Sequence, residues 1–329
     1  MPNLSSNGCS VWVTSSTQLA RTPTAIALGK FDGVHRGHQR VIDSIIQHRD
    51  FTTSSPTYAT VVTFHPHPQE FFSGTPRALL TPLEEKVQYL QSLHVDQLVL
   101  LPFDRELSAL APEDFVERIL VEQLCAVRIS VGADFRFGAK RTGTAKDLRA
   151  IAAKFSIPVE IICLETHSHS DISSSGDGDG RVSTSRIRDA LAQGDIQCAN
   201  HLLGRSYTLT GQVIQGKQLG RTIGFPTANL QLPPDKFLPK TGVYAVRITI
   251  GASDAVKYGV MNIGTRPTVA GENLTVEVHI FDWHQDLYGE KICVYLEKFI
   301  RPEQKFPSLD ALKSQIQADC VIAQNFFHC

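Results

Sequence analysis

The chain has 329 residues, of which 42% are hydrophobic and 20% are charged, and its formal net charge is −1. This length suits one large or two ordinary globular domains, and the charge gives no indication of a nucleic-acid partner. No stretch reaches the roughly 20 apolar residues that a membrane helix needs. Seven scattered cysteines without a CxxC pair are typical of reduced thiols, so we expect a cytoplasmic protein. The Ser- and Thr-rich segment 1–23 indicates a frayed end and a first strand, with an organelle-targeting role as the alternative.

Apolar, β-branched runs alternate with helical patterns up to about residue 165. The runs are TAIALG from Thr24, TYATVVTF from Thr57, VDQLVLL from Val95, VRISVG from Val127 and PVEIICL from Pro158. Apolar residues at helical spacing follow Gly37, and the same spacing recurs in PLEEKVQYLQSL and PEDFVERILVEQL. The alternation predicts a parallel sheet with helices on its faces. Ligands bind beyond the carboxyl ends of such strands, where Gly29–Gln39 would lie.

The second half of the chain has a different pattern. A Gly- and Ser-rich stretch at His167–Arg181 predicts a flexible loop, and TSRIRDALAQGD then predicts a helix that closes at Gly194. We place the domain boundary at residue 200, giving domains 1–200 and 201–329. Beyond it, strand-like runs separated by Gly and Pro turns predict an antiparallel barrel or sandwich. An amphipathic helix within PSLDALKSQIQADCVIAQNF ends the chain.

The segment GKFDGVHRGHQ, Gly29–Gln39, carries two histidines where the chain enters a helix. His35 and His38 are three residues apart, so both rings can lie on one side of the first turn. Free N–H groups at a helix start attract phosphate, and imidazoles can donate hydrogen bonds to it. Gly33 and Gly37 allow a ligand to approach the backbone. The alternatives are a glycine turn with surface histidines, and a zinc site for which no third ligand is evident.

Two further polar segments could serve the same site. Ser183, Thr184, Ser185 and two arginines, among them Arg188, gather at a predicted helix start, which suits a triphosphate clamp or an ordinary capped helix. Asp134 follows a strand and could bind ribose or metal or cap a turn. The HPHP stretch that contains His65 and Pro66 is expected to be a stiff loop.

The second half contains one misleading motif and one informative one. GQVIQGKQ fits a phosphate-loop pattern, but Gln218 replaces the required Ser or Thr and no helix clearly follows. GRTIGFPTANL, Gly220–Leu230, offers neutral oxygens at Thr227 and Asn229 that suit a magnesium ion carrying phosphate. Glu277 shares one face of an alternating strand with Thr275 and His279, so it is either a proton acceptor or part of a solvated face.

Several of these strings resemble known signatures. GKFDGVHRGHQ is similar to the (H/T)xGH nucleotidyltransferase signature in the form seen in bacterial FAD synthetases. Three further stretches resemble the same family: TFHPHP, GADFRFGAKRTG and VSTSRIRDAL. The last resembles the SSTxIR segment with Thr184 and Ser185 in reversed order. GRTIGFPTANL, GVYAV, GVMNIGTRPT, VEVHIFDW and DLYGEKICVYLEKFIRPEQKF resemble riboflavin kinases, with His284 and Gln285 departing from the usual FDFDGDLYG. Together the strings resemble the prokaryotic bifunctional riboflavin kinase/FAD synthetase family over Thr24–Asp319.

The resemblance implies a Rossmann-like nucleotidyltransferase domain followed by a six-stranded antiparallel β-barrel with a terminal helix. It implies a kinase that makes FMN from riboflavin and ATP with Mg²⁺, and an adenylyltransferase that makes FAD from FMN and ATP. The implied partners are these small molecules, without nucleic acid or membrane; a weak homo-oligomer is left open. The competing classes are an enzyme with only one of the two activities and a non-catalytic flavin carrier.

The resemblance also implies roles for individual residues. His35, His38 and Glu277 would be catalytic, with Glu277 as the base of the kinase. The residues implied to bind ATP for adenylyl transfer are Gly29, Phe31, Asp32, His35, Gly37, His38, Asp134, Ser183, Thr184, Ser185 and Arg188. Those implied to bind ATP and magnesium in the kinase are Gly220, Gly224, Pro226, Thr227 and Asn229, with Thr227 and Asn229 on the metal. Flavin contacts are assigned to His65, Pro66 and Arg301.

Overall fold

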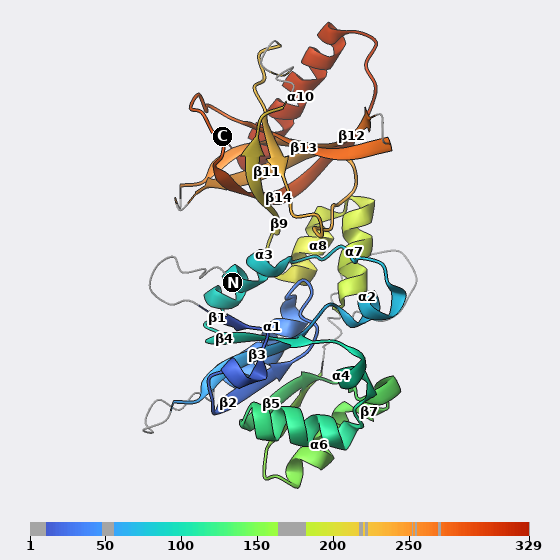
Figure 1. Cartoon of the computed structure of the whole chain (residues 1–329). Helices are drawn as coiled ribbons and strands as arrows, with labels where there is room; N and C mark the ends of the chain where they lie inside the picture. The colour runs from blue at the N-terminus through green and yellow to red at the C-terminus, as the bar shows by residue number, and fades with distance from the viewer. Residues whose placement is uncertain are drawn as a thin grey trace, which may run out of the picture. The chain divides into compact units, whose positions relative to one another are not determined.

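The computed structural model describes residues 11–47, 56–163, 182–216, 220, 223–251, 253, 255–268 and 271–328, apart from the side chains of 266–268 and 271–273. The predicted loop at His167–Arg181 lies outside the described residues. The chain divides into two compact units, Met1–Ser183 and Thr184–Cys329 (Figure 1).

The first unit is an α/β domain. Its strands are β1 (Trp12–Thr14), β2 (Thr24–Leu28), β3 (Tyr58–His65), β4 (Gln97–Pro102), β5 (Ala126–Gly132), β6 (Arg136–Phe137), β7 (Gly143–Thr144) and β8 (Val159–Ile162). Its α-helices are α1 (Arg36–Ile46), α2 (Pro68–Ser73), α3 (Leu83–Ser92), α4 (Arg105–Ala109), α5 (Pro112–Asp114) and α6 (Ala145–Ala153). A π-helical stretch, Phe115–Gln123, continues α5, and short 3₁₀ turns cover Thr17–Leu19 and Ala139–Arg141.

Six of these strands form one parallel sheet in the order β1-β4-β3-β2-β5-β8. The chain moves outward from β2 in one direction and then from β5 in the other, so the strand order reverses between these two neighbours. In open α/β sheets the ligand site lies at such a reversal, beyond the carboxyl ends of the two strands. The segments that follow β2 and β5 contain the predicted Gly29–Gln39 loop and Asp134. The predicted Rossmann-like class is confirmed.

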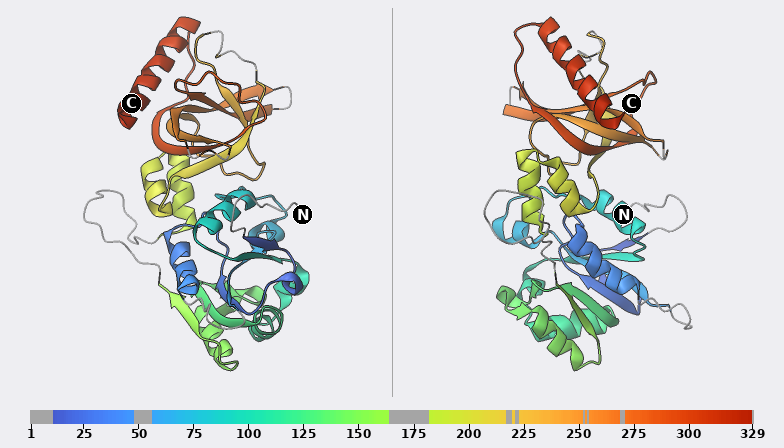
Figure 2. Two further views of the ribbon diagram at one scale, coloured as in Figure 1. Left: turned by 90° about the vertical axis from the view of Figure 1, so that its left-hand side faces the viewer. Right: turned by 180° about the vertical axis from the view of Figure 1, so that it is seen from behind.

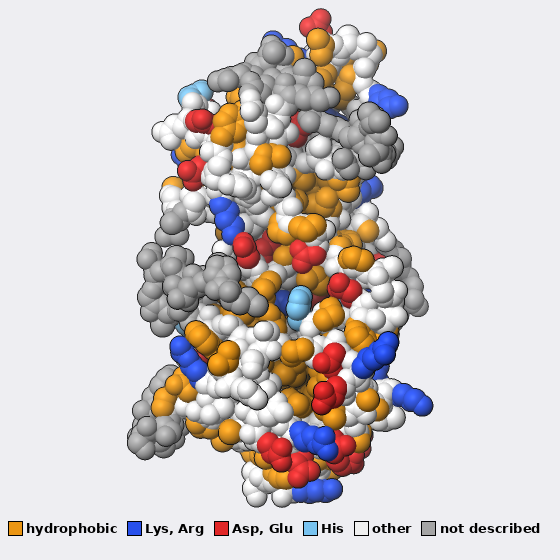
Figure 3. Space-filling model, in the orientation of Figure 1, with side chains coloured by type: hydrophobic (Ala, Val, Ile, Leu, Met, Phe, Trp, Pro, Cys, Tyr) orange, Lys and Arg blue, Asp and Glu red, His pale blue; other side chains and the backbone are white. Residues whose placement is uncertain are grey.

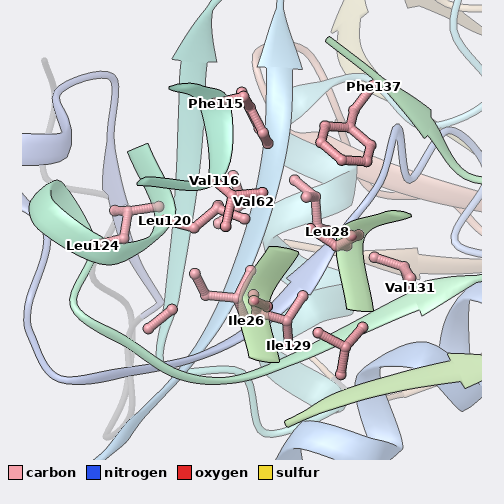
Figure 4. Close-up of a cluster of buried hydrophobic side chains, with 14 of the residues drawn as sticks. Ile26, Leu28, Val62, Phe115, Val116, Leu120, Leu124, Ile129, Val131 and Phe137 are labelled. Carbon is pink, nitrogen blue, oxygen red and sulfur yellow. The ribbon is translucent and has the colours of Figure 1, made fainter. Parts of the chain in front are cut away.

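Alternating side chains on β2 supply both faces of this sheet. Ala25 and Ala27 join a buried cluster with Ile42 and Ile45 of α1. Ile26 and Leu28 join the opposite cluster, in which Figure 4 shows them beside Val62, Phe115, Val116, Leu120 and Ile129. A strand that is buried on both faces reads as a continuous apolar run, and TAIAL is such a run.

The second unit is mainly a barrel. Helices α7 (Thr184–Gln193) and α8 (Ile196–Leu203) precede it, and α10 (Leu309–Phe327) follows it. The strands are β9 (Tyr207–Ile214), β10 (Ala228–Gln231), β11 (Gly242–Ile250), β12 (Lys257–Thr268), β13 (Gly271–Ile280) and β14 (Lys291–Pro302). They close in the order β10-β13-β12-β11-β14-β9, so the predicted six-stranded antiparallel barrel is confirmed.

Helix α10 covers one side of the barrel (Figure 2). Cys320 and Ala323 of α10 are buried against Val243, Ala245 and Val260 on the outer face of β11 and β12. Met261 and Val278 are fully buried and face the other way, into the barrel. Because Val260 is paired with His279, the outer face of β12 that supports α10 is continuous with the face of β13 that carries Glu277 and His279.

The predicted boundary at residue 200 falls inside α8. Helices α7 and α8 belong to the second unit: the Asn200 side chain donates to the Leu296 carbonyl at 2.8 Å and accepts from the Tyr207 amide at 2.7 Å. The Lys240 amide donates to the Leu191 carbonyl at 2.9 Å. The sequence separates TSRIRDALAQGD from the barrel because its helical pattern continues that of the first half. The packing instead joins α7 to the segment between β10 and β11, through Lys240 and Phe237, while α8 packs on β9 and β14.

Candidate active sites

The loop after β2 is held in an unusual backbone conformation by contacts with its neighbours. Phe31, Gly33 and Val34 all have positive φ, at 47°, 90° and 40°. Such angles are costly for Phe and Val and persist only where surrounding contacts enforce them. Phe31 and Val34 are fully buried, so their side chains are the anchors that fix the turn. Packing therefore fixes this loop, with Phe31 in the hydrophobic core.

Asp32 supplies the second support of this loop. Its Oδ1 accepts hydrogen bonds from the amides of Leu80, at 2.7 Å, and Thr81, at 3.3 Å. The Gly33 amide donates to the Thr81 hydroxyl at 3.0 Å. Asp32 is only 4% exposed, so its carboxylate ties two chain segments together. These contacts favour a role for Asp32 in forming the turn, and the ATP contact that the resemblance implies for it stays a prediction.

His35 and His38 lie where the sequence predicts, at the start of α1. His35 is the N-cap residue, and its Nδ1 accepts from the His38 amide at 3.3 Å. Neutral His35 therefore carries its hydrogen on Nε2. The two rings are stacked with centroids 3.7 Å apart and an angle of 18° between their planes. Phe31 lies 5.1 Å from the His38 ring. The pair places two imidazole groups at a helix start, the end of a helix that attracts phosphate.

A group of basic side chains near this loop was missed by sequence reasoning. The pKa of Lys30 is lowered by burial and by the positive charges of Arg141 and Arg77, while Asp134 opposes the shift. Burial, with Lys30 and Arg77, lowers the pKa of His67 to about 4. Such a concentration of positive charge suits a polyanionic ligand. Each residue comes from a different loop, so only the fold reveals the group.

Aromatic side chains surround the end of β3. Phe103 makes edge-on ring contacts with Phe64, Phe71 and Phe72, with centroids 5.4–5.8 Å apart. Phe72 is 71% exposed, which is unusual for a phenylalanine and leaves its ring available to a flat partner. His65 ends β3 and precedes Pro66 in the same region, and its carbonyl accepts from the Phe103 amide at 2.9 Å. The predicted flavin residues His65 and Pro66 therefore border this cluster.

The two halves of the predicted triphosphate clamp lie in different compact units. His35 and His38 belong to the first, whereas Thr184, Ser185 and Arg188 start α7 in the second. The Arg188 guanidinium carbon lies 4.8 Å from the centre of the Phe237 ring, a cation–π contact within the second unit. Assembly of these groups around one triphosphate remains a prediction.

The second site forms around β10 and β13. Asn229 is directly paired with Glu277, and Thr227 Oγ1 lies 3.4 Å from Glu277 Oε2. The predicted alternation on β13 is confirmed, because Val276, Val278 and Ile280 are buried while Glu277 is half-exposed. Asn262 of β12 flanks Glu277 on the other side and was missed by sequence reasoning.

The loop before β10 folds back on itself. The Phe225 amide donates to the Gly220 carbonyl at 2.8 Å, and Gly224 has φ of 90°. A Cβ on Gly220 would collide with the Phe225 carbonyl oxygen, so this position requires glycine. The turn delivers Pro226 and Thr227 to the edge of β13. His279 Nδ1 lies 2.8 Å from the Pro226 carbonyl oxygen.

Arg301, predicted to contact flavin, is engaged elsewhere. Its guanidinium makes three hydrogen bonds of 2.8–3.1 Å to Asp319 of α10, which is 2% exposed. Gln315 donates to the same carboxylate at 3.0 Å. These contacts tie α10 to β14, and the flavin role of Arg301 stays a prediction.

No group of three or more His, Cys, Asp or Glu side chains suited to a metal lies within the described ranges, so the zinc alternative for His35 and His38 gains no support there. The search of the same residues for a helix long and apolar enough to cross a bilayer also finds none. On the face drawn in Figure 3, acidic and basic side chains are interspersed.

The parallel sheet and the barrel, each with its own polar site, define a two-domain transferase. Residues 17–176 match the FAD synthetase family model and residues 203–327 match the riboflavin kinase model. The chain belongs to the bifunctional riboflavin kinase/FMN adenylyltransferase family. It is 39% identical to the Haemophilus influenzae member over 92% of this chain and 94% of that one. It is also 39% identical to the Escherichia coli K12 member over 94% of this chain and 95% of that one.

A solved structure has the same fold over nearly the whole chain. It is titled a macrolide-efflux protein from Streptococcus pneumoniae, shares 30% identity and superposes with a TM-score of 0.80. The match covers 96% of this chain and 99% of the Streptococcus pneumoniae chain. The similarity supports the two-unit architecture, and the function in that title is said of that protein alone.

Proposed function

We propose that the two family activities are divided between the two sites, with riboflavin phosphorylated at the barrel and FMN adenylylated at the parallel sheet. The observation that carries the kinase assignment is the juxtaposition of Thr227, Asn229 and Glu277 across β10 and β13. A hydroxyl, an amide oxygen and a carboxylate meet on one outer face of the barrel. This set fits transfer of a phosphoryl group from a metal-bound nucleotide to an alcohol.

These residues fit magnesium. Thr227 Oγ1 and Asn229 Oδ1 are hard, neutral oxygen ligands, and magnesium in nucleotide sites commonly takes few protein ligands beside phosphates and waters. Bound there, Mg²⁺ would neutralise charge on the β- and γ-phosphates of ATP. Glu277 would accept the proton of the riboflavin 5′-hydroxyl as its oxygen bonds to the γ-phosphorus and ADP leaves.

At the sheet, the N-terminus of α1 would hold the ATP phosphates. His35 presents Nε2–H because its Nδ1 caps the helix, and His38 stacks beside it. A phosphate oxygen of FMN would bond to the α-phosphorus of ATP as the bond to the β-phosphate oxygen breaks, releasing pyrophosphate. Donors at the helix start, together with Lys30 and Arg141, would stabilise the charge that builds up. Gly29, Gly37, Asp134, Ser183, Thr184, Ser185 and Arg188 remain the proposed nucleotide contacts.

The aromatic cluster at the end of β3 is the proposed flavin subsite of the adenylyltransferase. Its exposed Phe72 ring and the adjacent His65–Pro66 segment offer flat apolar surface to an isoalloxazine ring. The basic group around Lys30 and Arg77 would face the phosphate of FMN. We further propose a cytoplasmic location, where ATP is available and the scattered cysteines stay reduced.

The direct test is incubation of the chain with riboflavin, ATP and magnesium, followed by chromatographic separation of FMN from FAD. We expect FMN first and FAD after it. Glu277→Gln should lower the kinase rate by about 10²–10⁴-fold, the usual loss for a general base, while FAD still forms from supplied FMN. Ser253→Ala, at an exposed position on the barrel, is the matched control. If no FAD forms even from supplied FMN, the chain is an enzyme with kinase activity alone. If it binds flavin without consuming ATP, it is a non-catalytic carrier.

A further inference from the structure

His279 lies two residues after Glu277 on β13. Both project from the outer face, because Val278 between them is fully buried and Ile280 is 5% exposed. The sequence alone gives this histidine no role. In the structure it touches the loop that carries the proposed magnesium ligand.

The contact fixes the ring in one tautomer. His279 Nδ1 lies 2.8 Å from the Pro226 carbonyl oxygen. A carbonyl can only accept a hydrogen bond, so Nδ1 must carry the hydrogen, and in the neutral ring Nε2 is then unprotonated. The rings of Phe225 and Phe281 stand edge-on to the imidazole, with centroids at 5.5 Å and 6.0 Å. These two rings restrict how far the imidazole can turn away from the loop.

The hydrogen bond from His279 to Pro226 lies just beyond the end of the β10–β13 ladder, where it can fix the loop that carries Thr227. The backbone ladder between β10 and β13 includes Ala228–Val278 and Asn229–Glu277, so Pro226 and Thr227 lie just beyond it. Thr227 Oγ1 also approaches Glu277 Oε2 of β13 at 3.4 Å. That contact joins the two groups that the proposed reaction uses, one on the metal and one on the hydroxyl proton. The bond from His279 to Pro226 involves neither group and can persist throughout the reaction.

We propose that His279 is a positioning residue of the kinase site, which holds the Pro226 carbonyl through Nδ1–H and thereby sets Thr227 Oγ1 opposite Glu277. The proposal rests on the proposed kinase function of this site. A displacement of about 1 Å at a reacting group can cost about 10²-fold in rate, so one hydrogen bond outside the chemistry can matter.

Three substitutions of His279 distinguish the roles of its two ring nitrogens. In His279→Asn the side-chain amide can occupy the place of Nδ1, in His279→Gln it reaches the place of Nε2, and His279→Ala removes both. We expect His279→Ala and His279→Gln to lower the kinase kcat by about 10–100-fold and to raise the magnesium concentration needed for half-maximal rate. His279→Asn should stay within about threefold of wild type. Adenylylation of supplied FMN should be unchanged in all three, which shows that the first unit is folded, and an unchanged thermal unfolding midpoint of the full chain checks the barrel.

A matched control lies on the same strand. Thr275 is on the same face, two residues before Glu277, and donates to the Gly264 carbonyl at 3.3 Å. Thr275→Val should leave the kinase rate unchanged. A readout independent of activity is the ¹⁵N NMR spectrum of the histidine-labelled full chain at neutral to alkaline pH, with His279 assigned by the signals lost in His279→Asn. We expect Nδ1 protonated and Nε2 unprotonated.

The outcomes that overturn the proposal are distinct. Equal loss in His279→Asn and His279→Ala, or loss in Thr275→Val as well, would mean that the strand tolerates no change and that the Nδ1 contact has no special part. Protonation at Nε2, or full activity in His279→Gln, would show that Nδ1 is not the nitrogen that positions the loop. A wild-type chain that phosphorylates no riboflavin would contradict the proposed kinase function itself, and the positioning role with it.

Discussion

At the scale of single residues, the loop after β2 shows how a polar residue can serve a site without touching the ligand. Asp32 is buried and accepts from two backbone amides at the start of the segment that leads into α3. A buried acceptor of this kind is costly to remove, because the amides it satisfies lose their partner. The left-handed residues Phe31 and Val34 depend on such support.

Asp32→Ala should therefore lower the free energy of unfolding by about 1–3 kcal/mol and reduce adenylylation of FMN. Asp32→Asn, which keeps an oxygen acceptor of the same size, should lose less. Kinase activity should be unaffected by either change. Denaturant unfolding and the two flavin assays check this. Unchanged stability with lost ATP binding would point instead to direct contact with the nucleotide.

His67 gives the first unit a dependence on pH. Its pKa falls from 6.5 to about 4 in the folded chain, mainly through burial. The unfolded chain therefore binds more protons between these values, so the stability that neutral His67 contributes is complete above pH 6.5 and is lost as the pH falls toward 4. His67→Asn keeps an oxygen in place of Nδ1, which caps α2 by accepting from the Gln69 amide at 3.1 Å. Unfolding measured from pH 4 to 7 should show a shallower slope in His67→Asn, and an identical slope would contradict this account.

At the scale of elements, α10 is attached to the barrel by one buried ion pair as well as by apolar packing. Removing one member of a buried pair leaves an uncompensated charge and typically costs about 3–5 kcal/mol. Asp319→Ala should lower the free energy of unfolding by about that amount, because Arg301 would lose all three of its bonds to the carboxylate. The double change Arg301→Met with Asp319→Leu should recover most of the loss. If it also leaves the KM for riboflavin unchanged, Arg301 has no flavin contact; a raised KM in a stable double variant would support one.

At the scale of the whole molecule, the division between the compact units does not coincide with the end of the FAD synthetase match. That match ends at residue 176 and the riboflavin kinase match begins at 203, and the α7–α8 pair between them packs on the barrel. The helix that carries the predicted phosphate clamp is thus part of the barrel's own unit.

A fragment of residues 184–329 should therefore be more stable than a fragment of residues 204–329. Loss of the two Asn200 hydrogen bonds alone corresponds to about 2 kcal/mol, at about 1 kcal/mol each, and burial of Leu202 and Leu203 adds to it. Thermal unfolding of the two fragments under the same conditions checks this. Equal midpoints would mean that the helices contribute nothing to the barrel.

The sequence predicts the parts of this molecule that depend on local pattern. Strand β2, the helix capped at His35 and the outward face of β13 follow from the alternation and spacing of side chains over a few residues. The group around Lys30, Arg77 and Arg141 could not be predicted, because it forms from loops far apart in the chain. The positive φ of Phe31 and Val34, neither of them glycine, and the attachment of α7 to the barrel likewise depend on tertiary packing that overrides local preference.

Strand β10 has a consequence for how the chain can vary among relatives. Asn229 is paired on one side with Ile214 and on the other with Glu277, so neighbours on both sides fix its place in the ladder. An insertion or deletion of one residue between Pro226 and Asn229 would turn the Asn229 side chain to the opposite face of the barrel. Differences in length among natural homologues should therefore accumulate before Gly220, and the spacing from Pro226 to Asn229 should be constant wherever kinase activity survives.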